Sequence, residues 1–317
     1  MRRVLRTRPG VVLAAAALAL GLLAGCGTGP SQVGAAAIVG DRAVPLDQVQ
    51  QQLNTVLSKE GPEAKAQLKA GNQLDDVSRQ IVSLEVQHEL LTIMAQRERL
   101  SVDAQQVTSL IDELGGAEAA SGGTIYTAGN FRERARDQLL AVELGRKYLP
   151  RLAVTVDYTT TGTRTAAQQR VAQLAAAGAA GAREQIRRDV ERGGAAALDQ
   201  RIVAAQNPSF ASAPIFGVQE GTVVAFPSDQ QAGSWLVMVV TSRSATAGSS
   251  QPADEIEGLD ESLLAAAGLR QLAVTAERAG VRLNPRYGVW DRVSLQAVPS
   301  ANETTGFIEP LREAPAA

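Results

Sequence analysis

The stretch LDDVSRQIVSLEVQHELLTIMA, residues 74–95, carries the strongest periodic signal in the 317-residue chain. Side chains of one stripe recur in it at steps of three and four residues, which is the spacing of one face of an α-helix. The stripe consists of Leu74, Val77, Ile81, Leu84, His88, Leu91 and Ala95. The stretch therefore predicts a long helix with one buried side.

Further amphipathic helices are predicted on both sides of this segment. Before it, residues 35–45 form an extended, hairpin-like step with a turn at Gly40-Asp41, and a helix follows until Gly61-Pro62 interrupts the pattern. After it come a helix opened by residues 101–103, a small-residue loop over residues 115–129, a helix from about Asn130, a plausible N-cap, to Leu149, and a last helix over residues 259–279.

The middle of the chain has strand signals. Residues 154–161 alternate in the manner of a strand, and residues 165–177 and 181–192 read as two helices. The run SWLVMVVTS, residues 234–242, is nearly continuous in apolar side chains and suits the centre of a sheet. We therefore expect an α+β fold that is mainly α, in which a small α/β unit is inserted between helices.

Composition excludes several classes of function. The formal net charge of -2 excludes a generally basic nucleic-acid binder, and the aromatic content of 3% argues against a stacking platform for single strands. One cysteine cannot form an intramolecular disulfide, and one histidine excludes a His-rich zinc site. Neither a phosphate-binding nor a dinucleotide-binding glycine loop occurs. We expect no metal, no cofactor and no nucleic-acid partner.

The N-terminus has the features of an export signal. Four arginines precede an apolar stretch, residues 11–24, which is shorter than the roughly 20 residues of a membrane-spanning helix. Its end, Leu23-Ala24-Gly25-Cys26, resembles the lipobox of bacterial lipoproteins. The resemblance implies a signal peptide over residues 1–25 and a lipid-linked Cys26, which would anchor the protein on the extracytoplasmic side of the cell membrane. The alternative is an ordinary secretory signal in which the cysteine is accidental.

A flexible tether is predicted to follow the anchor. Residues 26–34 are mostly small and polar. Removing residues 1–25 takes away four arginines and no acidic residue, so the remaining chain is more acidic than the whole. An acidic chain should not adhere electrostatically to anionic lipid, and attachment would rest on the lipid alone.

Residues 35–156 resemble the helical module of the SurA and PrsA type of extracytoplasmic foldases. The similarity rests on AIVGD at residues 37–41, on the step Val44-Pro45-Leu46 and on LSVD at residues 100–103. Near the C-terminus, NPRYG at residues 284–288 is similar to the segment that rejoins this module. The resemblance implies a helical module over residues 35–153, completed by a C-terminal helix and clasp over residues 259–299. Tyr287 and Trp290 belong to that clasp, with a binding role as the alternative.

Residues 154–244 resemble a degenerate parvulin domain, the prolyl isomerase unit of the same family. The match includes FASAPIF at residues 210–216 and the strand-like run at residues 234–242. Active parvulins carry histidines on the first and last strands, whereas this segment contains neither histidine nor cysteine. Residues 158–161 and 235–236 stand at the corresponding places. We therefore assign no catalytic residue. The segment also has four large apolar residues that either line a groove or fill the core: Phe210, Phe216, Phe226 and Met238.

Two residues or segments need a separate interpretation. His88 is either a general base or, as we prefer, a core or groove-lining histidine with one hydrogen bond. Residues 245–258 read as a linker, and residues 300–317 read as a loose tail.

The sequence as a whole predicts a lipid-anchored chaperone that binds unfolded exported polypeptides without isomerase catalysis. The alternatives are a divergent peptidyl-prolyl isomerase and a scaffold lipoprotein for one dedicated partner.

Overall fold

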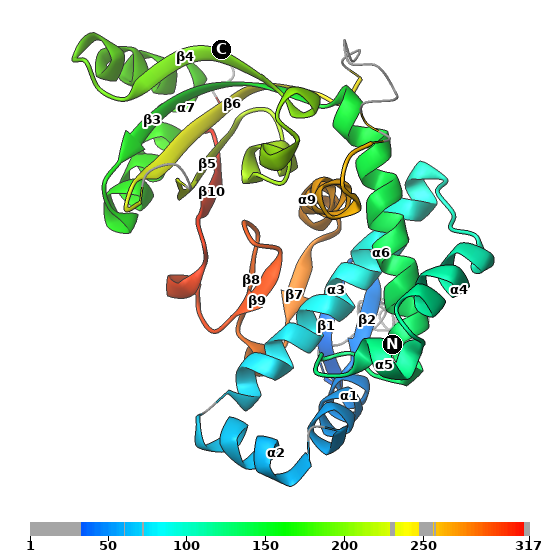
Figure 1. The fold of residues 1–317 in the computed structure, drawn as a ribbon. Helices are drawn as coiled ribbons and strands as arrows, with labels where there is room; N and C mark the ends of the chain where they lie inside the picture. The colour runs from blue at the N-terminus through cyan, green and yellow to red at the C-terminus, as the bar shows by residue number, and fades with distance from the viewer. Residues whose placement is uncertain are drawn as a thin grey trace, which may run out of the picture.

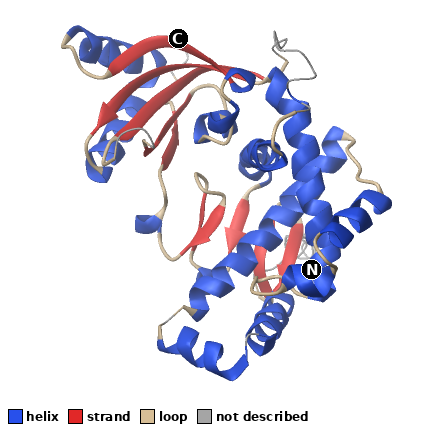
Figure 2. Cartoon of the chain, in the orientation of Figure 1, coloured by secondary structure: helices blue, strands red, loops and turns tan. Residues whose placement is uncertain are grey.

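A computed structural model describes residues 33–59, 61–71, 73–228, 232–246, 256 and 258–313. The signal peptide, the lipobox with Cys26, most of the tether and most of the linker lie outside these residues. The fold is mixed α/β (Figure 2). Figure 1 shows a five-stranded sheet at the upper left, most of the helices at the right, and α9 between the two groups. Within the described part of the chain, none of the helices combines the length and the hydropathy of a membrane span.

The helical part contains the predicted long helix and several shorter ones. Its members are α1 (Leu46–Lys59), α2 (Gly61–Ala70), α3 (Leu74–Glu98), α4 (Ala104–Glu113), α5 (Ala117–Ser121), α6 (Ala128–Tyr148) and α9 (Glu261–Ala279). The stretch that opened the sequence analysis forms α3. Of the predicted stripe, Ile81, Leu91 and Ala95 are buried and the other four residues are half-buried. The neighbouring Val82, Val86, Leu90 and Met94 are buried as well. Helices α2 and α5 occupy places where the sequence indicated a break and a loop. Helix α6 begins earlier than expected because Thr127 is its N-cap, and Asn130 completes a capping box.

A small three-stranded sheet joins the beginning and the end of the helical part. Its order is β2 (Arg42–Pro45), β1 (Ala35–Val39), β7 (Val281–Leu283), with antiparallel pairing. Every residue of β1 is buried, whereas only Val44 of β2 is, so β1 is the internal strand of the predicted hairpin. Because β7 follows α9 directly, this pairing fixes the C-terminal end of α9 against the N-terminal segment.

The large sheet is antiparallel and has the order β10 (Phe307–Pro310), β5 (Thr222–Pro227), β6 (Trp235–Ser244), β3 (Ala153–Thr161), β4 (Ala196–Val203). The apolar run at residues 234–242 is confirmed as its central strand, β6. Helix α7 (Arg164–Glu191) covers one face and is broken at Gly178, where φ is 68°. The break lies between the two helices that the sequence predicts, because a positive φ interrupts the helix and suits glycine.

The predicted loose tail at residues 300–317 is wrong for most of its described part. Strand β10 pairs with β5 as the edge of the large sheet, and the Leu311 amide donates to the Gly221 carbonyl at 2.8 Å. Phe307 and Ile308 point to opposite faces of the sheet and pack against two different hydrophobic clusters. A short strand with one apolar residue on each face gives no clear periodic signal. The prediction of a loose tail therefore rested only on the polar, proline-containing composition of this segment.

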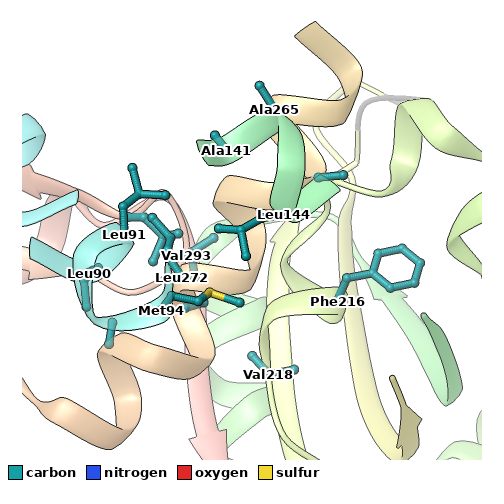
Figure 3. Packing of buried hydrophobic residues seen from close by; sticks show 14 of the residues in the cluster. Leu90, Leu91, Met94, Ala141, Leu144, Phe216, Val218, Ala265, Leu272 and Val293 are labelled. Atoms are coloured by element: carbon teal, nitrogen blue, oxygen red, sulfur yellow. The ribbon is translucent and has the colours of Figure 1, made fainter. Parts of the chain in front are cut away.

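Two glycines allow α6 and α9 to cross in close contact. A Cβ atom added at Gly268 would lie 2.0 Å from the Ala141 carbonyl oxygen, and one added at Gly145 would lie 2.0 Å from the Leu264 oxygen. No side chain larger than hydrogen fits at either position. Figure 3 shows Ala141, Leu144, Ala265 and Leu272 within this packing, with Met94 of α3 nearby.

One hydrophobic core runs from the helices into the large sheet. The cluster that contains Leu90, Met94 and Leu144 also contains Val154 and Val240 of the sheet. A second, smaller cluster lies on the opposite face, between α7 and the sheet. The side chains on the face of the large sheet that packs on the helices therefore share one core with the helices.

Candidate functional site

A cavity of about 420 Å³ lies where the helical part, the large sheet and the C-terminal segment meet. The residues that line it come from α9, from the loop after β4, from the segment after α9 and from β10. They are Gly217, Val218, Ala273, Ala276, Glu277, Gly280, Val281, Trp290, Arg292, Leu295 and Ile308. The volume is within the range of small-molecule and side-chain binding sites.

The α9 wall of the cavity is shaped by small residues. Ala273 and Ala276 lie on the side of α9 that lines the cavity, and the helix ends at Gly280. Opposite them, the 3-10 turn η4 (Pro214–Gly217) lies against α9 so closely that a Cβ at Gly217 would be 2.8 Å from the Arg270 carbonyl oxygen. Short side chains on α9 leave the space that the cavity occupies.

The opposite wall is a hairpin of β8 (Val289–Asp291) and β9 (Gln296–Val298). Its tight end is organised by the buried carboxylate of Asp291. One oxygen of Asp291 accepts from the Val293 amide at 2.9 Å, and the other accepts from the Ser294 hydroxyl at 2.8 Å and from the amide and hydroxyl of Thr305, each at 2.7 Å. These hydrogen bonds hold the hairpin and the approach to β10 in one arrangement.

A buried arginine attaches this hairpin to α9. Arg270 is 6% exposed and donates to the Val293 carbonyl oxygen at 2.8 Å. Burial lowers the pKa of Arg270 to about 10, an effect that the nearby Asp291 partly opposes. Arg270 therefore still carries its charge at neutral pH. Through this contact α9 fixes the position of the hairpin that supplies Trp290 and Leu295 to the cavity.

Trp290 gives the cavity its one aromatic wall. Its indole packs against the main core, and its Nε1 atom is buried and has no hydrogen-bond partner. A buried indole N–H usually has an acceptor, so this atom is an exception among the described residues. The sequence weighed Trp290 as a clasp residue or a binding residue; the structure places it in the β8–β9 hairpin and at the cavity wall, and its role stays a prediction.

The mouth of the cavity carries both signs of charge. Arg292 and Glu277 form an ion pair with an N–O distance of 2.8 Å, and both side chains are well exposed. Exposed pairs of this kind contribute little to stability. They are available to interact with polar groups of a ligand whose apolar part enters the cavity.

The sequence suggested a groove lined by four apolar residues, but none of them lines this cavity. They are Phe210, Phe216, Phe226 and Met238. Phe216, Phe226 and Met238 are buried in the main core, and Phe210 packs edge-to-face on Phe216 with ring centroids 6.2 Å apart. The alternative interpretation, core packing, describes them. Phe226 and Met238 face the helices from the sheet, whereas Phe210 and Phe216 lie in the 3-10 turns after β4, and all four pack in the main core or against it.

The structure brings the two parvulin-like motif positions together. Thr160 pairs with Leu236 and Thr161 pairs with Trp235 across the β3–β6 ladder. None of these four side chains has a titratable group in the physiological range. The hydroxyl of Thr161 is buried and has no partner among the described residues. The neighbouring motif positions are present, with Tyr158 and three threonines on β3 and Trp235 and Leu236 on β6, and none of these residues is a histidine or a cysteine.

A charged network on the large sheet was missed by the sequence analysis. Asp157 of β3 is buried, and its side chain accepts from Arg183 of α7 at 3.0 Å and from the Asp199 amide at 2.8 Å. Arg183 also holds the side chain of Asp199, and this hydrogen bond lowers the pKa of Asp199. The network joins α7 to β3 and β4 and stands away from the cavity-lining residues, so we interpret it as structural.

His88 belongs to a second charged network, between α3 and α6. Its Nδ1 atom lies 2.9 Å from the Asp137 carboxylate, and Arg134 contacts both Asp137 and the buried Glu85. The hydrogen bond to Asp137 raises the pKa of His88, although burial opposes the shift. The small cavity beside it measures about 90 Å³. With its ring held by a carboxylate on the neighbouring helix, His88 fits the interpretation of a packed, hydrogen-bonded histidine.

A second large cavity, of about 660 Å³, lies beside α3 and is more polar. Its walls include Gln73, Gln80, Gln87 and Gln296, together with Tyr126. Amide side chains donate and accept hydrogen bonds but do not select a charged group. Like the first cavity, it has an aromatic side chain, Tyr126, and an ion pair, between Arg79 and Asp76; it differs in its amide side chains.

No family model matches the chain, and neither does any protein in a search of curated proteins. Solved structures give distant similarities. The foldase protein PrsA of Lactococcus lactis is 11% identical, with 79% of this chain and 94% of that chain covered and a TM-score of 0.27. The peptidylprolyl isomerase PrsA of Bacillus anthracis is 13% identical, with 64% and 99% covered and a TM-score of 0.23. The foldase protein PrsA of Streptococcus pneumoniae is 13% identical, with 78% and 94% covered and a TM-score of 0.22.

Proposed function

We propose that this protein binds unfolded or partly folded exported polypeptides in the cavity between α9 and the β8–β9 hairpin. The observation that supports this most is the combination of aliphatic walls, the aromatic side chain of Trp290 and the ion pair at the rim. Apolar contacts are non-directional, so one cavity accepts many different side chains.

The proposed activity is that of a chaperone rather than an isomerase. The barrier to rotation about a peptide bond is roughly 18–20 kcal/mol, and lowering it needs groups that stabilise a twisted imide. The motif positions on β3 and β6 hold Thr160, Thr161, Trp235 and Leu236, and the sheet face toward the helices is filled by core residues. A divergent isomerase would need a site elsewhere in the chain.

The proposed place of action is the extracytoplasmic face of the membrane. The lipobox and Cys26 support this part of the proposal through the sequence alone. Replacing the lipid-accepting thiol, Cys26→Ser, should abolish lipid attachment and leave the protein soluble or unprocessed. Fractionation of the cell envelope after a salt wash checks this outcome. Correct processing together with continued membrane association of the Cys26→Ser variant would overturn the anchor.

Client binding is tested by aggregation of an unfolded protein, followed by light scattering. The mature chain should slow aggregation of several unrelated clients at stoichiometric excess. Ala276→Leu fills part of the cavity and should weaken this effect several-fold, while the matched control Ala172→Leu, on an exposed position of α7, should leave it unchanged. Equal effects of the two variants would contradict the cavity as the binding site.

The same preparations distinguish the other two functions. A prolyl isomerisation assay on a test peptide should show no acceleration comparable to that of an active parvulin. If acceleration is found, and a substitution within residues 154–244 abolishes it, the isomerase alternative holds. Failure to slow aggregation of any client would favour the scaffold alternative, in which the protein serves one dedicated partner.

A further inference from the structure

A smaller cavity of about 210 Å³ lies on a neighbouring side of α9 and collects arginines. Its lining residues come from α3, α6, the end of β6 and α9. They are Met94, Arg97, Glu98, Tyr148, Arg243, Ala245, Gln271, Val274 and Arg278. Three guanidinium groups thus border a space that also has an apolar wall.

Arg243 is a partly buried cation without a carboxylate partner among the described residues. It donates to the Gln271 amide oxygen at 2.7 Å and to the Phe216 carbonyl at 3.4 Å. Its Nε atom is buried and has no hydrogen-bond partner. A guanidinium that is partly desolvated and has no counter-ion is costly.

The surrounding charges leave this cation unbalanced. Glu98 is the one carboxylate that lines the cavity, and it is already held by Lys147 at 2.9 Å and by Arg97 at 3.0 Å. Burial lowers the pKa of Arg243; the nearby Tyr148 opposes this shift, and repulsion from Arg278 and Arg97 adds to it. The cavity therefore has an excess of positive charge that an oxyanion would neutralise.

The apolar wall restricts what kind of oxyanion fits. Met94, Val274 and Ala245 line the same space as the arginines. A ligand that places its charged group at Arg243 and Arg278 would place its apolar body against these side chains. A carboxylate on an aliphatic chain has both parts, and the planar fork of arginine binds carboxylates through two parallel hydrogen bonds.

We propose that this cavity binds a carboxylate of a polypeptide, at an acidic side chain or at the chain end, between Arg243 and Arg278. The proposal rests on the function proposed above and names a feature that clients would share. Residues 271, 274 and 278 of α9 line this cavity, and residues 273, 276, 277 and 280 line the larger one. The two cavities therefore lie on different sides of α9.

The chain offers a built-in reporter for this test. It contains three methionines; Met1 lies in the signal peptide, Met94 lines the arginine cavity, and Met238 lies in the sheet core. With methyl-¹³C-methionine in the full mature chain, acetyl-Leu-Leu as the free acid should shift the Met94 signal and leave the Met238 signal in place. Acetyl-Leu-Leu amide should bind about tenfold more weakly, the loss expected for one charge-assisted hydrogen bond.

Variants and a competing ion make the result decisive. Arg278→Gln should weaken binding of the free acid, while Arg192→Gln, at an exposed arginine that caps α7, should not. Equal affinity for the acid and the amide, or equal effects of the two variants, would overturn the proposal. So would inorganic phosphate that shifts Met94 at lower concentration than the free acid, because the cavity would then be a phosphate site.

Failure here is separable from failure of the proposed function. If Met94 does not respond to the free acid while the protein still slows aggregation through Ala276, the carboxylate proposal fails and chaperone activity stands. If Met94 responds but no client is protected from aggregation, a carboxylate site is present and the chaperone function fails.

Discussion

The two faces of the large sheet are covered in different ways. On one face, α7 packs on Val223, Ala225 and Val237 and forms a separate hydrophobic cluster. On the other face, Val224, Met238 and Val240 belong to the core of the helical part. The first face is closed by a helix that belongs to the sheet unit itself. The second face depends on α3, α6 and α9, and the candidate site lies at this junction.

This difference shows that the parvulin-like segment is not an independent unit in this protein. Its sheet is completed by β10, which follows the C-terminal clasp, and half of its apolar surface is buried by helices from outside the segment. The cavity needs residues from both sides. Of the motif positions on β6, Leu236 packs against this shared core, whereas Trp235 belongs to the cluster under α7.

Removing the C-terminal part should have the largest effect on this arrangement. A chain that ends after Ser250 lacks α9, the clasp and β10, and it leaves apolar stripes of α6 and of the sheet in water. Burial contributes roughly 25 cal/mol per Å² of apolar surface, so the lost contacts amount to many kcal/mol. We expect an aggregation-prone chain without cooperative thermal unfolding, measured by calorimetry. Melting at the same temperature as the whole chain would contradict the shared core.

A single methyl group at the helix crossing should be the next most damaging change. In Gly268→Ala the new Cβ would lie 2.0 Å from the Ala141 carbonyl oxygen, so α6 and α9 must move apart. We expect a loss of about 3 kcal/mol in the free energy of unfolding, measured by urea denaturation. The control Gly162→Ala adds the same group where no atom lies within 4 Å, and it should change stability by a few tenths of a kcal/mol. Similar losses in both variants would contradict the close crossing.

Deleting β10 should weaken the sheet to an intermediate extent. Phe307 packs on Trp235 with ring centroids 5.8 Å apart, and Thr305 donates twice to Asp291. A chain that ends after Glu303 loses these contacts and exposes the edge of β5. We expect it to fold with a stability lower by about 1–3 kcal/mol and to expose Trp235, which a red shift of its fluorescence would report. Unchanged stability and fluorescence would support the loose-tail prediction after all.

The smallest expected effect is the dependence of stability on the protonation of His88. The hydrogen bond to Asp137 raises the pKa of His88 in the folded state, so the charged pair stabilises the fold fully below the ordinary pKa of about 6.5. This contribution is lost as the pH rises through the folded pKa. Relative to His88→Gln, the native protein should therefore lose stability between pH 6 and pH 8. The pKa can be read directly from the NMR signal of this sole histidine, and a value at or below 6.5 would contradict the pairing.

The long elements of the fold could be predicted because their side chains repeat with a regular period. The stripe of α3 has the helical period, and the run that forms β6 is apolar throughout, as a central strand requires. Strand β4 gave no such signal because it is an edge strand without fully buried residues. The partner of β10 lies some 80 residues away in the chain, and four residues are too few to show a period.

The candidate site could not be predicted because it is made by distant segments of ordinary composition. Ala273 and Ala276 matter for the space that they leave, and alanine carries no chemical signature. Gly217 matters for its close approach to α9, which only the tertiary structure reveals. The sequence did point to Trp290, through the segment that resembles the foldase clasp. It also pointed to four apolar residues that the structure places in the main core or against it, two of them on the covered face of the sheet.

The central claim is that clients contact the cavity at the junction and not the closed α7 face. Photo-crosslinking at two exposed positions tests it most directly: a benzophenone side chain in place of Arg292 at the cavity rim, and in place of Val190 on α7. With a permanently unfolded, reduced and alkylated protein as the client, we predict a cross-link yield at position 292 at least several-fold above that at position 190. An excess of folded client should leave both positions unreacted. Equal yields at the two positions, or a higher yield at position 190, would contradict the account.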